Sequence, residues 1–374
     1  MTDSATITVP ASAHDQASTN LPTTARGWGT EAADQPLKPM TFERRALRPN
    51  DVAIRITHTG ICHSDLHTCR NDWHNSRFPV VPGHEIVGTV TAVGPDVATH
   101  KVGDIVAVGC MVDSCMECDQ CKEGWEVFCE KGNVGTYNGT DKQDGSLTKG
   151  GYSDHIVVRD HFCCKVPAGM DIARVAPLLC AGITTYSPLR QYGVGEGSKV
   201  AVVGLGGLGH MGVKLAAAMG AHVTMITTTA SKGDDARELG AHDVILSTDA
   251  AQMKAATKRF DFILNTIPVK HDIAPYLQLL GRSGRMVLVG MIDNVPEFHS
   301  FSLLSMNRAV GGSAIGGIPE TQEMLDFCAE HGIYPECETI RMDQVNEAYE
   351  RLLKNDVRYR FVIDMATLDQ AATT

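Results

Sequence analysis

The chain has 374 residues, of which 43% are hydrophobic and 21% charged, and its formal net charge is −11. This composition is typical of a soluble globular protein with room for two domains, and it excludes an intrinsically disordered chain. The negative charge argues against nucleic acid or an anionic membrane as the main partner, because both would repel it. No apolar run approaches the roughly 20 residues that a membrane span needs.

The first 25 residues contain no lysine or arginine before Arg26 and no apolar segment of the kind that a secretory signal carries. Their content of serine, threonine and alanine predicts a flexible arm over residues 1–26, with the fold beginning near Trp28. Twelve cysteines in a chain without an export signal indicate metal or catalytic use, not a disulfide framework. We therefore expect a cytoplasmic protein.

Three regions with different patterns of apolar and polar residues follow. Over residues 27–170, short alternating runs broken by glycine predict a β-rich domain: DVAIRITHTG, IVGTVTAVG, DIVAVG and SDHIVVRD. Over residues 171–317, six apolar runs from KVAVVG to AVGGSAIG alternate with helical segments, which predicts a doubly wound, parallel nucleotide-binding domain. Residues 318–374 contain two amphipathic helices and a strand, YRFVIDM, that we expect to return to the first domain.

Gly204, Gly206 and Gly209 form GLGGLG between the strand KVAVVG and the start of a helix. Glycines at these positions permit a tight turn and let backbone N–H groups approach a pyrophosphate at the helix N-terminus. A lone motif of this kind is often only a flexible turn. Here further strand–helix elements follow it, and the combination favours dinucleotide binding.

The end of the second strand of this domain distinguishes the two nicotinamide cofactors. NAD-binding folds usually place an acid there for the ribose 2′-hydroxyl, but this sequence reads MITTTASK, with no acid before Asp234. Hydroxyl groups and the ammonium of Lys232 suit a 2′-phosphate, which an acid would repel. The segment therefore favours NADP, although an ordinary polar loop has the same composition.

Cys115, Cys118, Cys121 and Cys129 are spaced CxxCxxCx7C. This spacing predicts a tetrahedral zinc site that is closed by four sulfurs and has a structural role. An iron–sulfur cluster can use similar spacing, but nothing else in the sequence resembles an electron-transfer protein. A scatter of buried free cysteines is the remaining alternative. Cys110 lies outside the spacing, and we expect it in a strand.

Cys62, His84 and Cys180, in ICHSDLH, VPGHEIVG and LLCAGITTY, offer two thiolates and an imidazole. Such a set leaves a fourth position open, as catalytic zinc requires, and Glu85 is placed to fill it at rest or to exchange with water and substrate. Taken singly, each residue is more often a packing residue than a ligand. Cys180, however, opens the helix that leads to the nucleotide domain, which predicts a metal in the cleft between the domains.

Zinc in such a cleft polarises a carbonyl oxygen or promotes alkoxide formation, while the cofactor carries the hydride. A proton must still be exchanged with water. We expect Ser64 to exchange it with the substrate oxygen and His67 to pass it to solvent. Both residues also fit an ordinary polar loop.

Five motifs resemble the zinc-dependent medium-chain alcohol dehydrogenases: CHSDLH, GHEIVG, CxxCxxCx7C, APLLCAGITTYSPL and GLGGLGHMG. Within them, the sequence is similar to the cinnamyl alcohol dehydrogenase-like branch, which includes bacterial broad-specificity aldehyde reductases. The resemblance runs from about Trp28 to Asp364, includes VRYRFVID, and leaves the N-terminal arm without a counterpart.

The resemblance implies a GroES-like β-rich catalytic domain, a doubly wound Rossmann domain, one catalytic and one structural zinc, and a homodimer. It places Cys62, His84, Glu85 and Cys180 at the catalytic zinc, with Ser64 and His67 in the relay. The residues that we expect to contact NADP(H) are Thr184, Gly204, Gly206, Gly207, Leu208, Gly209, Thr227, Thr228, Lys232, Thr266, Gly290, Ser313 and Ile315. One departure is Gly233, where related sequences often carry a basic residue, so we expect one cationic contact fewer and a weaker hold on NADP.

Trp73 and Met111 are expected to line the substrate pocket, although Trp73 equally suits ordinary core packing. The leading hypothesis is an NADP(H)-dependent zinc alcohol dehydrogenase that acts mainly as an aldehyde reductase on small molecules. One alternative is an NAD-dependent dehydrogenase of polyols or secondary alcohols. The other is a zinc- and nucleotide-binding redox sensor without turnover that uses the thiols of Cys163 and Cys164.

Overall fold

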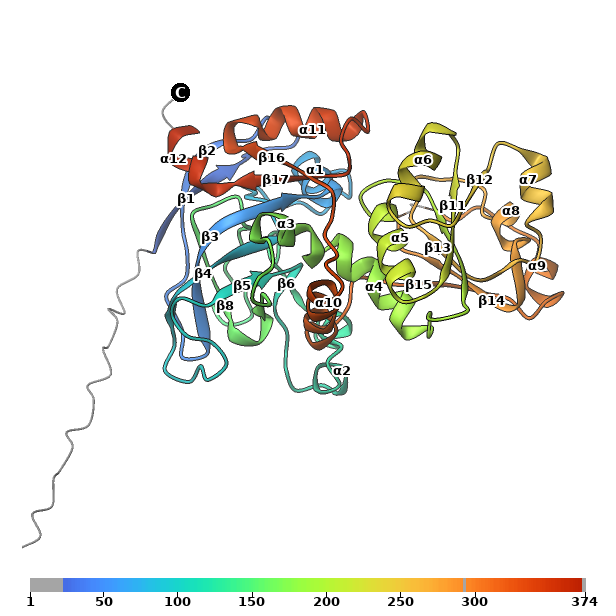
Figure 1. The fold of residues 1–374 in the computed structure, drawn as a ribbon. Coiled ribbons are helices and arrows are strands. Elements are labelled where there is room, and N and C mark those ends of the chain that lie inside the picture. Colours follow the sequence, from blue (N-terminus) through green and yellow to red (C-terminus); the bar gives the residue numbers. More distant parts are fainter. Residues whose placement is uncertain (1–22, 292–293, 372–374) are drawn as a thin grey trace, which may run out of the picture.

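The computed structural model describes residues 23–291 and 294–371, which form two parts with helix α4 (Ala181–Gln191) between them (Figure 1). Most of the predicted arm, residues 1–26, lies outside the described residues. Its last residues belong to the fold, because β1 (Thr24–Gly29) pairs antiparallel with β2 (Lys38–Glu43).

A seven-stranded sheet forms the first part, in the order β16-β17-β3-β4-β5-β9 with β8 paired to β3. Its strands are β3 (Asp51–Ile61), β4 (Ile86–Val93), β5 (Ile105–Val108), β8 (His155–Arg159), β9 (Cys164–Lys165), β16 (Cys337–Arg341) and β17 (Arg360–Asp364). Strands β6 (Met111–Asp113) and β7 (Val134–Gly135) form a separate pair. Ile54, Leu66 and Phe361 lie fully buried in the core of this part. The predicted β-rich first part is confirmed.

The last strand lies in the first sheet. β17 runs antiparallel to β3, with Phe361 opposite Ile61, and β16 pairs parallel with β17 on its other side. The whole second part lies between β9 and β16 in the chain, and both of these strands belong to the first sheet. The nucleotide-binding region is therefore inserted within the first part. Helix α11 (Val345–Leu353) connects β16 to β17 and packs its buried face, which includes Val345 and Leu352, on the same core.

Six parallel strands form the second sheet, in the order β12-β11-β10-β13-β14-β15. They are β10 (Lys199–Val203), β11 (His222–Thr227), β12 (Asp243–Leu246), β13 (Phe260–Asn265), β14 (Leu280–Leu288) and β15 (Ala309–Gly312). In chain order this is 3-2-1-4-5-6, the order of a dinucleotide-binding fold. The predicted doubly wound domain is confirmed.

Apolar residues on both faces of β10 explain why its sequence does not alternate in polarity. Val200 and Val202 belong to the core shared with α4 and α5 (Gly209–Ala218), whereas Ala201 and Val203 belong to the core on the opposite face. Helix α6 (Ser231–Glu238) joins the first of these cores, and α7 (Ala250–Ala255), α8 (Ala274–Leu277) and α9 (Phe301–Leu304) lie on the second (Figure 1).

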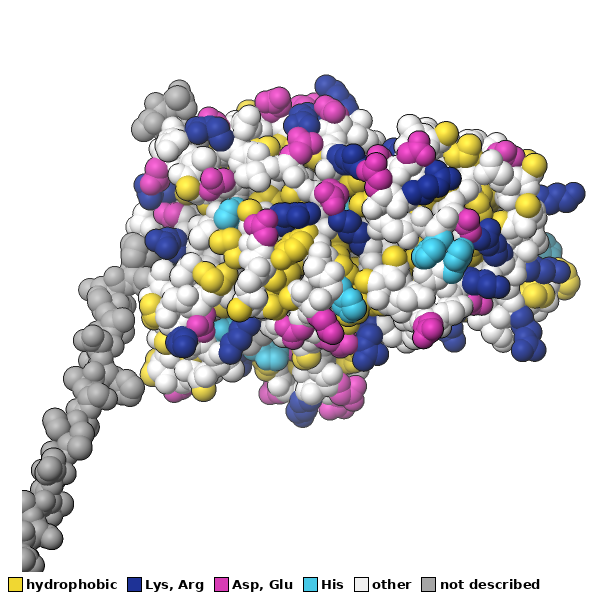
Figure 2. All heavy atoms as spheres, in the orientation of Figure 1, with side chains coloured by type: hydrophobic (Ala, Val, Ile, Leu, Met, Phe, Trp, Pro, Cys, Tyr) yellow, Lys and Arg dark blue, Asp and Glu magenta, His cyan; other side chains and the backbone are white. Residues whose placement is uncertain are grey.

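The remaining helices connect these elements. They are α1 (His63–Arg70), α2 (Asp119–Lys122), η1 (Glu126–Phe128), η2 (Asp160–Phe162), α3 (Ile172–Val175), η3 (Ala176–Leu179), α10 (Ile318–Glu330), η4 (Met342–Gln344), η5 (Met365–Thr367) and α12 (Leu368–Ala371). Among the described residues, no helix has the length and apolar character to cross a membrane. Figure 2 shows basic and acidic side chains interspersed on one face of the molecule, without a large patch of either sign.

Candidate metal and cofactor sites

The predicted open metal site is assembled from three distant segments. Cys62 follows β3 and caps α1, His84 and Glu85 precede β4, and Cys180 caps α4. One ligand atom from each of the four residues lies within 4.8 Å of the other three, and all four side chains are buried. The fold thus brings together the residues that the sequence pattern had selected.

The geometry of this group fits zinc. The Sγ atoms of Cys62 and Cys180 are 3.8 Å apart, and two sulfurs about 2.3 Å from a tetrahedral zinc ion would be separated by about 3.8 Å. The Oε2 atom of Glu85 is buried without a hydrogen-bond partner among the described residues. Two thiols, an imidazole and an unpartnered carboxylate oxygen form a donor set that a zinc ion satisfies.

Asp65 organises this group and is not among the residues predicted from the sequence. Its fully buried carboxylate accepts hydrogen bonds from His84 Nδ1 (3.0 Å), from the Cys62 backbone N–H (2.8 Å) and from the Gly83 N–H (3.0 Å). Because Nδ1 of His84 donates to Asp65, Nε2 is left as the ligand atom. The sequence signal that could have identified Asp65 is an acid three residues after Cys62, in the first turn of a helix.

Arg360 was also missed, because the motif VRYRFVID had been noted without a role for its arginines. The Arg360 guanidinium is buried on β17 and forms an ion pair with Glu85 Oε1. Burial raises the pKa of Glu85, and the charge of Arg360 opposes that shift. A Cβ added at Gly207 would lie 3.0 Å from Arg360 Nη1, so the same side chain borders the glycine loop. An arginine within an apolar strand was the sequence signal for this contact.

The second cysteine group has the closed form that its spacing predicts. Cys115, Cys118, Cys121 and Cys129 bring their Sγ atoms within 4.8 Å of one another. The Cys115–Cys121 and Cys118–Cys121 sulfur distances are 3.9 Å and 3.5 Å. Four sulfurs at these separations match a tetrahedral structural zinc site.

The expectation that Cys110 lies in a strand is wrong. The chain bends at Cys110 between β5 and β6, because Thr136 bonds to the carbonyl oxygens of Gly109 and Cys110. Cys110 Sγ lies 3.8 Å from the Leu179 carbonyl oxygen. A hydrogen bond from Cys180 lowers the pKa of the Cys110 thiol. Cys110 therefore borders the open group and is absent from the closed one.

The relay and pocket residues lie on α1 and beside it. Ser64 Oγ is 3.7 Å from Cys62 Sγ, whereas His67 reaches the surface, where its Nδ1 is 2.7 Å from Asp72 Oδ2. The ring of Trp73 lies 5.4 Å from that of His67, and its 36% exposure excludes ordinary core packing. Met111 is buried on β6.

The expected cofactor residues share one edge of the second sheet. Gly204, Thr227, Thr266, Gly290 and Ser313 follow or end β10, β11, β13, β14 and β15, whose carboxyl ends all face the same way. Thr266 Oγ1 donates to the carbonyl oxygens of Val203 (2.9 Å) and Gly204 (3.0 Å), which supports the glycine loop. This contact spans β10 and β13, where the strand order reverses and dinucleotides bind.

Glycine is required within the loop itself. Gly204 has a φ of 92°, and a Cβ at Gly209 would overlap the Gly204 carbonyl oxygen. Leu208 caps α5, directly after Gly206 and Gly207. The loop therefore presents the N-terminus of α5 to this edge of the sheet.

Thr184 and Ile315 complete the expected cofactor contacts. Thr184 is one turn beyond Cys180 on α4, with its N–H bonded to the Cys180 carbonyl oxygen (2.9 Å). Ser313 is bonded through its N–H to the Leu288 carbonyl oxygen (3.2 Å), and Ile315 follows it with a positive φ of 41°.

The residues expected at the 2′-phosphate lie at the end of β11 and just after it, and they differ in exposure. Thr227 is buried, Thr228 is exposed, and Lys232 Nζ lies 3.4 Å from the Leu205 carbonyl oxygen in the glycine loop. A Cβ at Gly233 would lie 2.9 Å from Val244 Cγ1. A side chain at this position would point at β12, so the glycine has a packing role.

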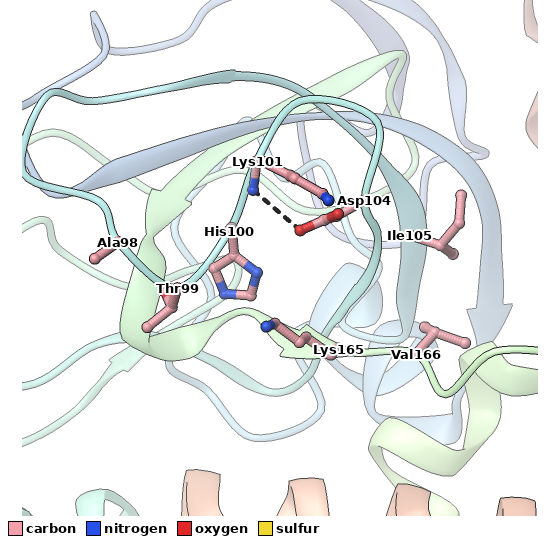
Figure 3. Close-up of a pocket in the computed structure, with 8 residues that line it drawn as sticks. All are labelled: Ala98, Thr99, His100, Lys101, Asp104, Ile105, Lys165 and Val166. Atoms are coloured by element: carbon pink, nitrogen blue, oxygen red, sulfur yellow. Dashed lines mark hydrogen bonds between the residues drawn. The ribbon is translucent and has the colours of Figure 1, made fainter.

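Two surface cavities lie away from these sites. One cavity has a volume of about 430 Å³. Figure 3 shows the residues that line it: Ala98, Thr99, His100, Lys101, Asp104, Ile105, Lys165 and Val166. A second cavity, of about 260 Å³, lies beside Arg45, Asp51 and Arg159. Neither cavity contains an expected site residue. The candidate site is therefore defined by its ligand geometry and by the edge of the second sheet.

Zinc content tests the two groups separately. We expect two zinc ions per chain in the purified protein, and one in each of Cys62→Ser and Cys121→Ser, because each variant removes one thiolate ligand. Elemental analysis of the purified variants measures this. Cys337→Ser, which alters a cysteine outside both groups, should keep two ions. A Cys62→Ser protein with two zinc ions would contradict the assignment of the open site.

Comparisons with known proteins agree with this geometry. Residues 48–168 match the alcohol dehydrogenase GroES-like domain, and residues 207–330 match the zinc-binding dehydrogenase family. The chain is 53% identical to aldehyde reductase YahK of Escherichia coli (91% of this chain, 98% of the relative). It is 52% identical to NADP-dependent alcohol dehydrogenase C 1 of Mycolicibacterium smegmatis (92% and 99%).

Two solved structures show the same fold over the same extent. The structure resembles a cinnamyl alcohol dehydrogenase from Sorghum bicolor with a TM-score of 0.89 and 47% identity (92% of this chain, 98% of that one). It resembles a cinnamyl alcohol dehydrogenase from Helicobacter pylori, complexed with NADP(H), with a TM-score of 0.86 and 43% identity (92% and 99%). Similarity of this degree over almost the whole chain confirms the predicted resemblance: the chain belongs to the zinc-binding alcohol dehydrogenase family.

Proposed function

We propose that the protein transfers a hydride between NADP(H) and a primary alcohol/aldehyde pair, and that it acts mainly as a broad-specificity aldehyde reductase. The observation that carries this proposal is the open donor set of Cys62, His84 and Cys180, buried at the start of α4. Arg360 contacts Glu85 beside that set and borders the glycine loop, so the metal and the cofactor are brought to one place.

The chain's own residues account for orientation and proton exchange. Zinc, when bound, supplies a Lewis acid for a carbonyl oxygen, and NADPH supplies the hydride. Ser64, beside Cys62, exchanges a proton with the substrate oxygen. His67, one turn further along α1 and paired with Asp72, takes up that proton from solvent during aldehyde reduction and returns it to solvent during alcohol oxidation. Trp73, in ring contact with His67, and Met111 form the aromatic and apolar walls of the substrate pocket.

Turnover tests this function. Cys62→Ser should lower aldehyde reduction by NADPH about 100- to 1,000-fold, since Lewis-acid catalysis is worth several kcal/mol. Binding of NADPH, followed by its fluorescence, should remain because the glycine loop is intact. Cys337→Ser is the control and should turn over normally. A Cys62→Ser enzyme or a chelator-stripped enzyme that kept full turnover would refute a metal-dependent reaction.

NADP is proposed as the cofactor, with Thr227, Thr228 and Lys232 at the 2′-phosphate. The similarity to NADP-dependent relatives supports this choice, and so does the position of Lys232 beside the glycine loop. The acids that follow are engaged elsewhere: Asp234 pairs with Arg237 (3.0 Å), and Asp235 accepts from Tyr359 Oη (3.0 Å). The alternative of an NAD-dependent dehydrogenase of polyols or secondary alcohols is disfavoured, because this chain lacks the acid that NAD-binding folds usually place here.

Lys232→Ala tests the cofactor assignment. Loss of a charge-assisted hydrogen bond should raise KM for NADPH about 10- to 100-fold, while KM for NADH stays unchanged because NADH has no 2′-phosphate. Steady-state kinetics with both cofactors measure this, with exposed Lys254→Ala as the matched control. An equal rise in both KM values would show that Lys232 does not distinguish the cofactors.

The redox-sensor alternative is disfavoured by burial. Cys163 and Cys164 are almost fully buried, and burial raises the pKa of Cys163 well above its ordinary value and that of Cys164 to about 12. Thiols in such surroundings are poor nucleophiles. All twelve cysteines lie in the described part of the chain and are free, which supports the proposed cytoplasmic location.

We also propose a domain division in which residues 27–170 and 318–374 form the catalytic domain and residues 171–317 the Rossmann domain. The pairing of β17 with β3 supports it. The proposed homodimer forms through β15, the edge strand of the second sheet. On α9, the helix that precedes β15 in the chain, Phe301 and Leu304 are 63% and 73% exposed. An edge strand with unpaired backbone groups can pair antiparallel with its own copy.

The double variant Phe301→Glu/Leu304→Glu should be monomeric, because it places charges against their symmetry mates in an apolar contact. Light scattering coupled to size-exclusion chromatography measures the mass. Val102→Glu, at a 51% exposed valine in the first part, is the control and should remain a dimer. A monomeric wild type, or a dimer that survives both substitutions, would contradict this interface.

A further inference from the structure

Glu126 lies at the contact between the closed cysteine group and α10. We call residues 115–129 the cysteine lobe; it includes α2, which lies next to α10 in Figure 1. The Glu126 side chain is fully buried, and each of its carboxylate oxygens has one partner. Oε1 accepts from His161 Nε2 (2.5 Å), and Oε2 accepts from the backbone N–H of Ile318 (2.9 Å). The lobe thus binds the first residue of α10 through a buried carboxylate.

Two glycines bring the backbones of the lobe and the helix into direct contact. A Cβ at Gly317 would overlap the Gly124 carbonyl oxygen and would lie 3.0 Å from Glu126 Oε2. A Cβ at Gly124, which has a φ of 81°, would lie 2.9 Å from Pro319 Cγ. A side chain at either position would separate the two segments, so the close approach depends on both glycines.

The segment that Glu126 anchors continues directly from the expected nicotinamide contacts. Ile315 has a φ of 41°, in the left-handed region that β-branched residues avoid. Such a conformation costs about 1–3 kcal/mol and persists only when its surroundings hold it. On one side, Ser313 N–H is bonded to the Leu288 carbonyl oxygen of the second sheet (3.2 Å). On the other side, Ile318 N–H is bonded to Glu126.

We propose that Glu126 is a positioning residue for hydride transfer, through which the cysteine lobe holds residues 313–315 against the nicotinamide ring. The proposal rests on the proposed function for the identity of the cofactor. A closed zinc site would then act on the reaction at a distance: it shapes the lobe, the lobe places Glu126, and Glu126 fixes the N-terminus of α10. The chemistry itself still takes place at the open site.

Glu126→Ala removes both hydrogen bonds and should lower kcat and the single-turnover rate of NADPH oxidation at least about tenfold, the lower end of what displaced reacting groups lose. KM for the aldehyde and a content of two zinc ions per chain should stay unchanged. Glu126→Gln keeps an oxygen for the Ile318 N–H and should restore most of the rate. Glu123→Ala, at an exposed glutamate of the same lobe, is the matched control.

Ile318→Pro provides a second route to the same contact. Proline removes the N–H donor at the first helical position, where it is well tolerated, and also shortens a side chain that packs on the core; the preceding Gly317 already has extended backbone angles (φ −74°, ψ 171°). Ile318→Val, which keeps the N–H, is its control. The proline variant should lose rate as Glu126→Ala does, and it decides the question if Glu126→Ala fails to fold.

NADPH fluorescence separates this proposal from the proposed function, because it reports the surroundings of the nicotinamide ring without turnover. We expect the emission change on binding to be reduced in Glu126→Ala and Ile318→Pro and normal in both controls. If the wild type reduces no aldehyde, but the emission change is still smaller in the two variants than in the wild type and the controls, the proposed reaction fails and the positioning role stands. Rates within about twofold of wild type in both variants, or a loss of rate that follows loss of zinc, would overturn the positioning role.

Discussion

A buried ion pair between Glu85 and Arg360 holds the metal site, the cofactor loop and the end of the chain together. Glu85 follows the ligand His84, and Arg360 belongs to the last strand, next to Gly207 in the glycine loop. Two charges removed from water must satisfy each other, and loss of one partner costs about 3–5 kcal/mol. This ion pair forms only once the chain has returned to its first sheet after the nucleotide-binding region.

The two metal groups differ in how they depend on the fold. Four cysteines within 15 residues of chain fold around one point and leave no place for substrate. The open group needs three separate segments, and the buried carboxylate of Asp65 connects two of them by bonding His84 and the backbone at Cys62. Chemistry is possible at the group that the fold assembles, because its fourth position is not filled by a sulfur.

Parallel strands give the cofactor its place. Since all six strands of the second sheet run the same way, their carboxyl ends bring together residues from Gly204 to Ser313 along one edge. Glycine is needed where the loop turns with a positive φ and where α5 starts against the Gly204 carbonyl oxygen. Through Glu126 and Ile318, the far end of this edge is also connected to the cysteine lobe of the first part.

Local patterns in the sequence predicted the two-part fold, both metal groups and the glycine loop. CxxCxxCx7C and GLGGLG depend only on short spacings and on the elements next to them, and six non-alternating apolar runs are a direct consequence of burial on both faces. The contacts of Asp65, Arg360 and Glu126, and the bend at Cys110, were decided by the tertiary structure. Glu85 and Arg360 are 275 residues apart in the chain, and Glu126 and Ile318 are 192 apart. A buried charge finds its partner only through packing, because no spacing along the chain records which strands and helix ends will meet.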